Sequence, residues 1–229
     1  MTDLHAFVKS KMQPLSFKEY LDFIESYNPN NLNALFEDYL EYGGLPTVIE
    51  LKDHPDTIGP FLTGIYNTVL LKDVVQRNNV RDATLLESVL KFIAANIGST
   101  VSTKKISDYL TSRGRKTTSE TIDNYLKMLE NAFIIYRANR FDLKGKLFLK
   151  TLEKYYIVDT GIRNQLTGLR NTAYGHVLED VIYFELLRRG YDVSIGKVGT
   201  LEVDFVASKA NKKIYYQVSA TLIYNKNKM

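Results

Sequence analysis

The sequence predicts an α+β fold, in which a mainly helical first half leads into two groups of β-strands. Three observations support this prediction. Apolar residues recur at helical spacing through most of residues 16–132, β-rich runs occupy residues 133–160, and a helix at 175–189 precedes three short strands. With 229 residues, the chain is long enough to bury a core in one or two domains.

The first segment, residues 1–80, is expected to be a helical lead-in without catalytic residues. Ser16 and Glu19 have the spacing of a capping box, in which the side chain of each residue accepts a hydrogen bond from the backbone N–H of the other. Asn, Pro and Gly residues then separate the helices. The expected helices cover residues 16–27, 32–42 and 60–77.

The second segment, residues 81–160, has the order of a winged helix. Gly98 is expected to end its first helix, and Gly145 lies in a turn at 143–146 between two β-rich runs. In a winged helix the third helix can enter the major groove of DNA while the hairpin contacts phosphates. The expected helices are residues 83–98, 104–112 and 118–132, and the strands lie within 133–142 and 146–160.

Positive charge is concentrated in this second segment. The chain has a net charge of +4, and residues 101–150 hold eleven basic against five acidic side chains, whereas residues 1–100 hold eight against thirteen. The block is therefore the candidate contact surface for DNA, and a merely solvated surface is the alternative. The predicted nucleic-acid-binding residues are Lys104, Lys105, Arg113, Arg115, Lys116, Thr118, Arg140, Lys144 and Lys146, with Thr117, Ser119 and Asn124 as further groove-facing positions.

The third segment, residues 161–229, follows the α-β-β-β order of the restriction-endonuclease-like fold. A short helix at 162–166 precedes the long helix at 175–189, and strands are expected at 192–196, 202–207 and 214–219. Nucleases of the PD-(D/E)xK type use this layout to bring carboxylates and a lysine to Mg²⁺. The candidate catalytic and metal-binding residues are Glu179 and Asp204, with Gln217 and Ser219 at the positions of the second strand carboxylate and the lysine.

Gln217 and Ser219 argue against cleavage. Both positions are expected to face the same side of the third strand, but Gln217 offers a neutral carbonyl oxygen and Ser219 carries no cation. The chain is therefore not expected to be an enzyme, and a Mg²⁺-dependent nuclease using Glu179 and Asp204 is the alternative. The lysines that could replace the missing cation lie near turns: Lys197, Lys209, Lys212 and Lys213.

Other kinds of site find little support. The sequence contains no cysteine, which excludes disulfides and thiolate metal sites. Its three histidines, His5, His54 and His176, lack the spacing of zinc ligands. No apolar run is long enough to cross a bilayer, so no membrane partner and a cytoplasmic location are expected.

Several motifs taken together resemble one known family: LSFKEYLDF, YLEYGGLPTV, YNTVLLKDVVQRNNVRD, EKYYIVDTGIRN, GHVLEDVIYFELLRRGYDV, EVDFVA and YYQVS. Over residues 13–221 they look like the C-terminal region of bacterial and archaeal AAA-type ATPases, in which a domain of unknown function follows a P-loop core. The resemblance implies a winged helix and a restriction-endonuclease-like domain, which in this family is often degenerate at the positions of Gln217 and Ser219.

The sequence departs from this family in two ways. It has no GxxxxGK[ST] motif, so ATP is implied only for an ATPase core that would precede residue 13, and no cofactor is expected for the chain itself. It also stops ten residues after Ser219, where the family carries a further helix and strand. We therefore expect a fragment that acts as a non-catalytic DNA-binding or targeting region. DNA, a separate ATPase core and another protein are the candidate partners, and a protein-interaction module is a further alternative.

Overall fold

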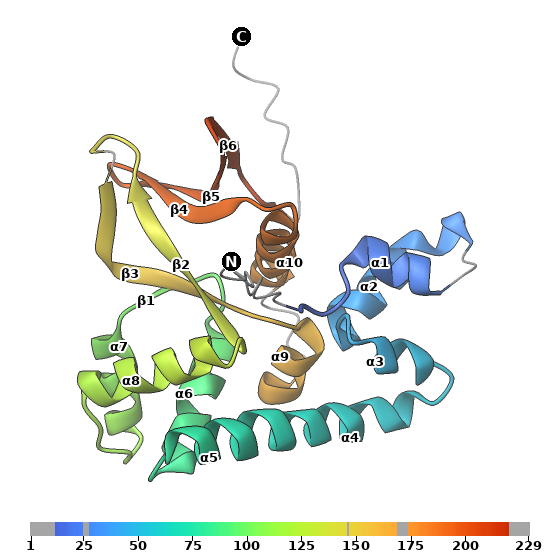
Figure 1. Ribbon diagram of the computed structural model, residues 1–229, viewed down its shortest axis with the longest axis horizontal. Coiled ribbons are helices and arrows are strands. Elements are labelled where there is room, and N and C mark those ends of the chain that lie inside the picture. Colours follow the sequence, from blue (N-terminus) through green and yellow to red (C-terminus); the bar gives the residue numbers. More distant parts are fainter. Residues whose placement is uncertain (1–11, 25–27, 146, 169–173, 220–229) are drawn as a thin grey trace, which may run out of the picture.

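The computed structural model describes residues 12–24, 28–145, 147–168 and 174–219, with the side chains of 69–71 and 147–151 left out. It confirms the α+β fold class, because helices pack around a mixed six-stranded sheet (Figure 1). The strands follow the order β1-β3-β2-β4-β5-β6. None of the described helices is both long and apolar enough to cross a membrane.

The N-terminal part is helical, as expected. Ser16 caps α1 through the predicted capping box with Glu19. The helix expected at 60–77 begins earlier, because Pro55 takes the first position of α4, where its missing N–H costs no hydrogen bond. The helices are α1 (Phe17–Phe23), η1 (Pro29–Asn31), α2 (Leu32–Tyr42), α3 (Pro46–Glu50), α4 (Pro55–Ile65), the π-helical η2 (Tyr66–Asp73) and α5 (Val74–Asn78).

Three capped helices and three strands follow. The side chains of Asp82, Ser102 and Thr118 each accept a backbone N–H from the first turn of the helix that they precede. The predicted hairpin is confirmed, since β2 and β3 pair in antiparallel fashion and β1 joins the other edge of β3. The elements are α6 (Ala83–Ala95), β1 (Thr100–Val101), α7 (Thr103–Ser112), α8 (Ser119–Asn131), β2 (Ile135–Asp142) and β3 (Leu147–Ile157).

The last part adds two helices and three strands. They are α9 (Thr160–Thr167), α10 (Tyr174–Arg188), β4 (Asp192–Val198), β5 (Leu201–Lys209) and β6 (Lys212–Tyr216). The distal end of β2 pairs in parallel with β4, from Arg140 opposite Ile195 to Asp142 opposite Lys197. One sheet therefore crosses the boundary expected near residue 160, and the division into segments stays a prediction.

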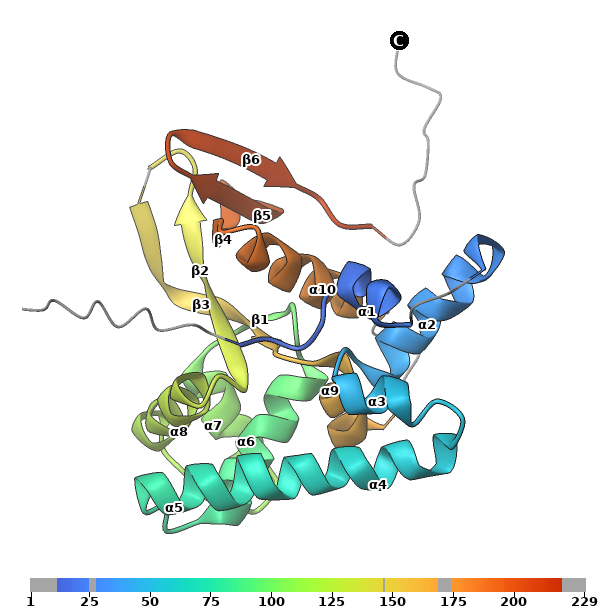
Figure 2. The same cartoon turned by 45° about the vertical axis from the view of Figure 1, so that its right-hand side comes forward.

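Two cores hold these elements together. The larger one combines the N-terminal helices with α6, α7, α8, α9, the start of β2 and the end of β3. The smaller one lies where α10 packs against the sheet (Figure 2). It includes Tyr183 and Phe184 from α10, Ile195 from β4 and Phe205 from β5. The sheet thus contributes to both cores.

Asp159 joins the N-terminal helices to the rest of the fold. This buried carboxylate accepts the N–H of Gly44 at 2.8 Å and the N–H of Ile162 at 3.0 Å, so it caps α9 and holds the end of α2. A Cβ added to Gly161 would lie 2.0 Å from the carbonyl oxygen of Tyr42. Glycine at this position is therefore what permits α9 to approach α2 so closely.

Candidate functional site

A buried ion cluster joins α10 to β3 and β5. Glu179 Oε2 accepts hydrogen bonds from Lys154 Nζ at 3.2 Å and from the Tyr156 hydroxyl at 3.3 Å. The same ammonium group lies 2.7 Å from Glu202 Oε1. Burial of Lys154 opposes its charge, but the two carboxylates outweigh burial and raise the pKa of Lys154 above its ordinary value. The cluster therefore holds a protonated lysine between two carboxylates.

Strand geometry explains why β5 supplies two acidic residues to this side of the sheet. Glu202 and Asp204 are two residues apart and so face the same side. A bulge between Val203 and Val206, opposite β4, then turns Phe205 to this side as well, where it packs under α10. Acidic and aromatic side chains consequently lie next to each other beneath the helix.

The segment that follows β6 provides two hydrogen-bond donors to Asp204. Its Oδ2 accepts a hydrogen bond from Gln217 Nε2 at 2.6 Å and from the backbone N–H of Val218 at 2.7 Å. The prediction that the third strand reaches Ser219 is wrong, because β6 ends at Tyr216. The physical reason is that the Val218 N–H bonds to a side chain instead of to a neighbouring strand. Gln217 is therefore a hydrogen-bond donor to Asp204.

Lys154 and Glu202 were not among the residues predicted for the site. None of the lysines considered there contacts Glu179 in the described part of the chain: Lys209, for example, donates to the carbonyl of Arg189, and Lys213 lies over the ring of Phe141. The sequence does contain one indication of the Lys154 contact. Lys154 lies two residues before Tyr156 in a β-rich run, so both side chains are expected on the same face of the strand. Among the described residues, no group of three or more His, Cys, Asp or Glu side chains is arranged to hold a metal ion.

A second feature is the cluster of exposed cations at the end of α7. We call residues 113–116, Arg-Gly-Arg-Lys, the basic loop. Arg115 and Lys116 are exposed, and their side chains form no hydrogen bond or ion pair with a described residue. Lys105 on α7 is likewise exposed and unpaired within the described chain, whereas Lys104 is bound to Asp108 at 3.1 Å. Four of the predicted contacts are thus exposed: Lys105 in the first turn of α7, and Arg113, Arg115 and Lys116 after its last turn.

The remaining predicted contacts lie elsewhere. Thr118 is the N-cap of α8, so its hydroxyl is already used by the helix. Arg140 is not on the surface: it is only 7% exposed on β2, and its Nε has no hydrogen-bond partner in the described structure. Lys144 is exposed at the tip of the β2–β3 hairpin, and Lys146 lies outside the described residues. Both views show this tip at the opposite end of the molecule from α7 and α8 (Figures 1 and 2), so the hairpin and the basic loop form separate surfaces.

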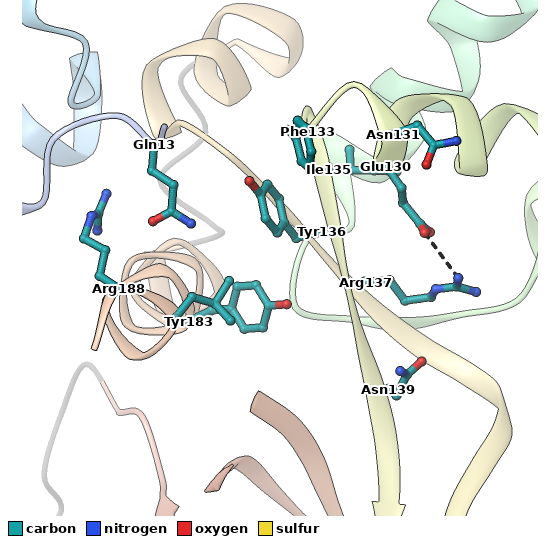
Figure 3. Close-up of a pocket in the computed structure, with 11 residues that line it drawn as sticks. Gln13, Glu130, Asn131, Phe133, Ile135, Tyr136, Arg137, Asn139, Tyr183 and Arg188 are labelled. Carbon is teal, nitrogen blue, oxygen red and sulfur yellow. Dashed lines mark hydrogen bonds and ion pairs between the residues drawn. The ribbon is translucent and has the colours of Figure 1, made fainter. Parts of the chain in front are cut away.

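A hollow of about 820 Å³ is the third feature (Figure 3). It lies between the end of α8, β2 and α10, and Figure 3 shows the Tyr183 ring directed from α10 toward β2. Arg137 donates to Glu130 Oε2 at 3.2 Å, while Glu130 Oε1 is buried without a partner in the described structure. Burial raises the pKa of Glu130. The walls mix both charges with aromatic rings and amides, but they present no nucleophile paired with a base.

Comparison with known proteins places this chain among domains without an assigned activity. A family described as "Domain of unknown function (DUF8612)" matches residues 33–173. An uncharacterized protein of Haemophilus influenzae is 42% identical over 216 residues, which cover 93% of this chain and 53% of that protein. An uncharacterized protein of Methanocaldococcus jannaschii is 28% identical over 224 residues, which cover 90% of this chain and 48% of that protein.

The chain spans about half the length of the curated relatives it matches. No solved structure matches it. The family match extends over more than half of the chain, from α2 through the hairpin and α9, and includes both the basic loop and Lys154. The chain therefore belongs to the DUF8612 family of domains of unknown function.

Proposed function

We propose that this chain is a non-cleaving nucleic-acid-binding region of a larger AAA-type ATPase. The observation that carries the proposal is the group of exposed cations on α7 and in the basic loop. Residues 103–118 hold five basic side chains and one acidic one, a net charge of +4. Unpaired cations on one surface attract a polyanion, because binding releases the counterions condensed on its phosphates.

The order of elements supports a winged helix as the carrier of this surface. Three helices, α6, α7 and α8, followed by the β2–β3 hairpin are in the order expected for that motif. The greater length of the relatives and the motifs shared with the C-terminal region of AAA-type ATPases support a role as part of a longer protein. ATP would then be bound by the other part.

A metal-dependent nuclease is the second candidate, because Lys154 supplies beside Glu179 the cation that position 219 lacks. Two contacts weigh against it. The ammonium of Lys154 already lies on Glu179, and Asp204 is engaged by Gln217. Breaking a buried ion pair costs about 3–5 kcal/mol, which a metal ion would have to offset before it could bind.

Binding to duplex and single-stranded DNA at several salt concentrations tests the proposal. The logarithm of the affinity should fall with the logarithm of the salt concentration by about 0.7–0.9 per phosphate neutralised. Replacing Arg113, Arg115 and Lys116 by alanine should reduce this slope by about 2–3 and weaken binding. The matched control replaces Lys144, Lys212 and Lys213, which removes the same charge at the hairpin end.

Two outcomes would refute the binding proposal: an affinity that does not depend on salt, or an equal loss in both triple variants. Incubation of plasmid with Mg²⁺ or Mn²⁺ tests the absence of cleavage. We expect no nicking. Nicking that disappears in Asp204→Ala would establish the nuclease instead, whereas nicking that persists in this variant would come from a contaminant.

A further inference from the structure

The exposed face of α8 is poorly suited to enter a DNA groove. Its outer side carries two acidic side chains, Glu120 and Asp123, against the single base Lys127, which is bound to Asp123 at 2.6 Å, whereas Glu130 lies in the larger hollow and is paired with Arg137. Phosphates line both edges of the major groove, so a helix face with a net charge of −1 would be repelled there. A nucleic acid on the basic loop must therefore be held by another element.

A hollow of about 240 Å³ lies beside the basic loop, between α6 and α7. Its size is below that of sites for whole drug-sized ligands, and it is open to solvent on the side of Tyr109, whose side chain is 39% exposed. The Tyr109 ring contacts the ring of Phe92 edge-on, with centroids 4.9 Å apart. An aromatic ring is thus held in place by the core while part of it remains accessible.

One guanidinium group lies over this ring, and a second lines the hollow beside it. The Arg113 guanidinium carbon lies 4.8 Å from the centroid of Tyr109, and Arg115 lines the same hollow. Gly114 has a φ of +84°, and the N–H of Arg115 binds the carbonyl of Leu110 at 2.9 Å, so the loop is fixed on the end of α7. The cations are therefore presented in a set arrangement next to the ring.

We propose that this surface binds nucleic acid as a single strand, with one base stacked on the Tyr109–Arg113 pair and the adjoining phosphates held by Arg115 and Lys116. This inference rests on the proposed nucleic-acid binding and names its substrate class. Aromatic rings and guanidinium planes stack on exposed bases, and flanking cations follow the backbone without reading sequence. In a duplex the bases are already stacked on each other and cannot reach the ring.

Fluorescence anisotropy with a labelled single strand of about 12 nucleotides and a duplex of equal length tests this inference. The single strand should bind at least about tenfold more tightly at equal salt. Tyr109→Leu should weaken its binding by about tenfold, since stacking of one base is worth about 1–3 kcal/mol. Tyr109→Phe should bind as the unmodified chain does.

Arg113→Lys separates stacking from charge, because it keeps the cation but removes the planar group. It should weaken single-strand binding without reducing the salt slope. The control is Tyr174→Leu, which removes a ring that is 45% exposed on α10 and far from the basic loop in sequence. The unfolding transition of each variant, followed by circular dichroism, shows that the fold is retained.

Tighter binding of the duplex, or unchanged single-strand binding in Tyr109→Leu, would overturn the inference. In that case the proposed function would still stand, provided that binding depends on salt and on the three cations of the basic loop. If neither form of DNA binds, both the proposed function and this inference fail.

Discussion

Buried acidic side chains are the residues whose chemistry the fold changes most. Asp180 on α10 is 2% exposed and accepts the N–H of Ile157 at 2.8 Å. Burial raises its pKa well above the ordinary value, and the nearby charge of Asp159 adds to this, whereas the Ile157 N–H and Arg163 oppose it. The unfolded chain releases this proton near pH 4, while the folded chain retains it to higher pH.

This difference predicts how stability depends on pH. Because the folded form binds the proton more tightly, the contribution of Asp180 is fully present below about pH 4 and is lost as the pH rises through its folded-state pKa. Asp180→Asn keeps an acceptor for Ile157 but does not titrate. Its free energy of unfolding should therefore fall less between pH 4 and pH 7 than that of the unmodified chain. Urea denaturation across this range measures both, and equal slopes would contradict the assignment.

Lys154 is an example of a contact that could not be predicted from the local spacing of residues. The α-β-β-β order of the sequence singled out Glu179 and Asp204 as candidate metal-binding residues. The partner of Glu179 comes from β3, 25 residues earlier, and that of Asp204 from the segment after β6. Such pairings depend on how strands far apart in the sequence come together, which local spacing does not encode.

The ion cluster is an interaction between elements, since it joins β3 to α10 and β5. Lys154→Met should lower the free energy of unfolding by about 3–5 kcal/mol, because Glu179 would be left buried without its cation. Adding Glu179→Gln should recover much of this loss, because it removes the unpaired buried charge. The other carboxylate, Glu202, can be hydrated without Lys154, since its side chain is 33% exposed. Urea denaturation of the single and double variants measures the coupling. Losses that simply add would show that the two side chains do not support each other.

The close approach of α9 to α2 leads to a prediction about two glycines. Gly161→Ala would place a Cβ 2.0 Å from the Tyr42 carbonyl oxygen, so the helices must separate, at a cost of at least about 1–3 kcal/mol. Gly64→Ala, on the exposed side of α4, meets no atom within 4 Å and should stabilise the helix by about 0.5–1 kcal/mol. Thermal unfolding should therefore shift in opposite directions, and a shared direction would contradict this account.

For single elements, the starts of helices could be predicted better than the ends of strands. Capping side chains such as Ser16, Asp82 and Thr118 mark helix starts locally. Ser16 caps α1 through the predicted capping box, and α6 and α8 begin within a residue of their expected starts. The end of β6 could not be predicted in this way. It depends on a hydrogen bond from Val218 to Asp204, a residue of the neighbouring strand.

The whole molecule is organised by one sheet, whose strands come from two of the segments expected from the sequence. The parallel pairing of β2 with β4 brings together residues more than 50 positions apart, such as Arg140 and Ile195. Nothing in either strand marks its partner, because both read as ordinary β-rich runs. The larger core likewise combines residues of all three expected segments, among them Leu62, Ile122 and Val177.

This continuity predicts that the expected second and third segments unfold together. Ile122 on α8 and Phe205 on β5 are both fully buried, each in a different core. Ile122→Ala should lower the free energy of unfolding by about 2–5 kcal/mol, and Phe205→Ala by about 3–5 kcal/mol.

If the sheet couples the two cores, either variant should accelerate hydrogen exchange of the α8 and α10 amides by the same factor, because both helices are protected by the same global unfolding. Mass spectrometry of peptides covering Ser119–Asn131 and Tyr174–Arg188 measures this directly. Acceleration confined to the helix of the altered core would instead establish two independent folding units, with the boundary near residue 160.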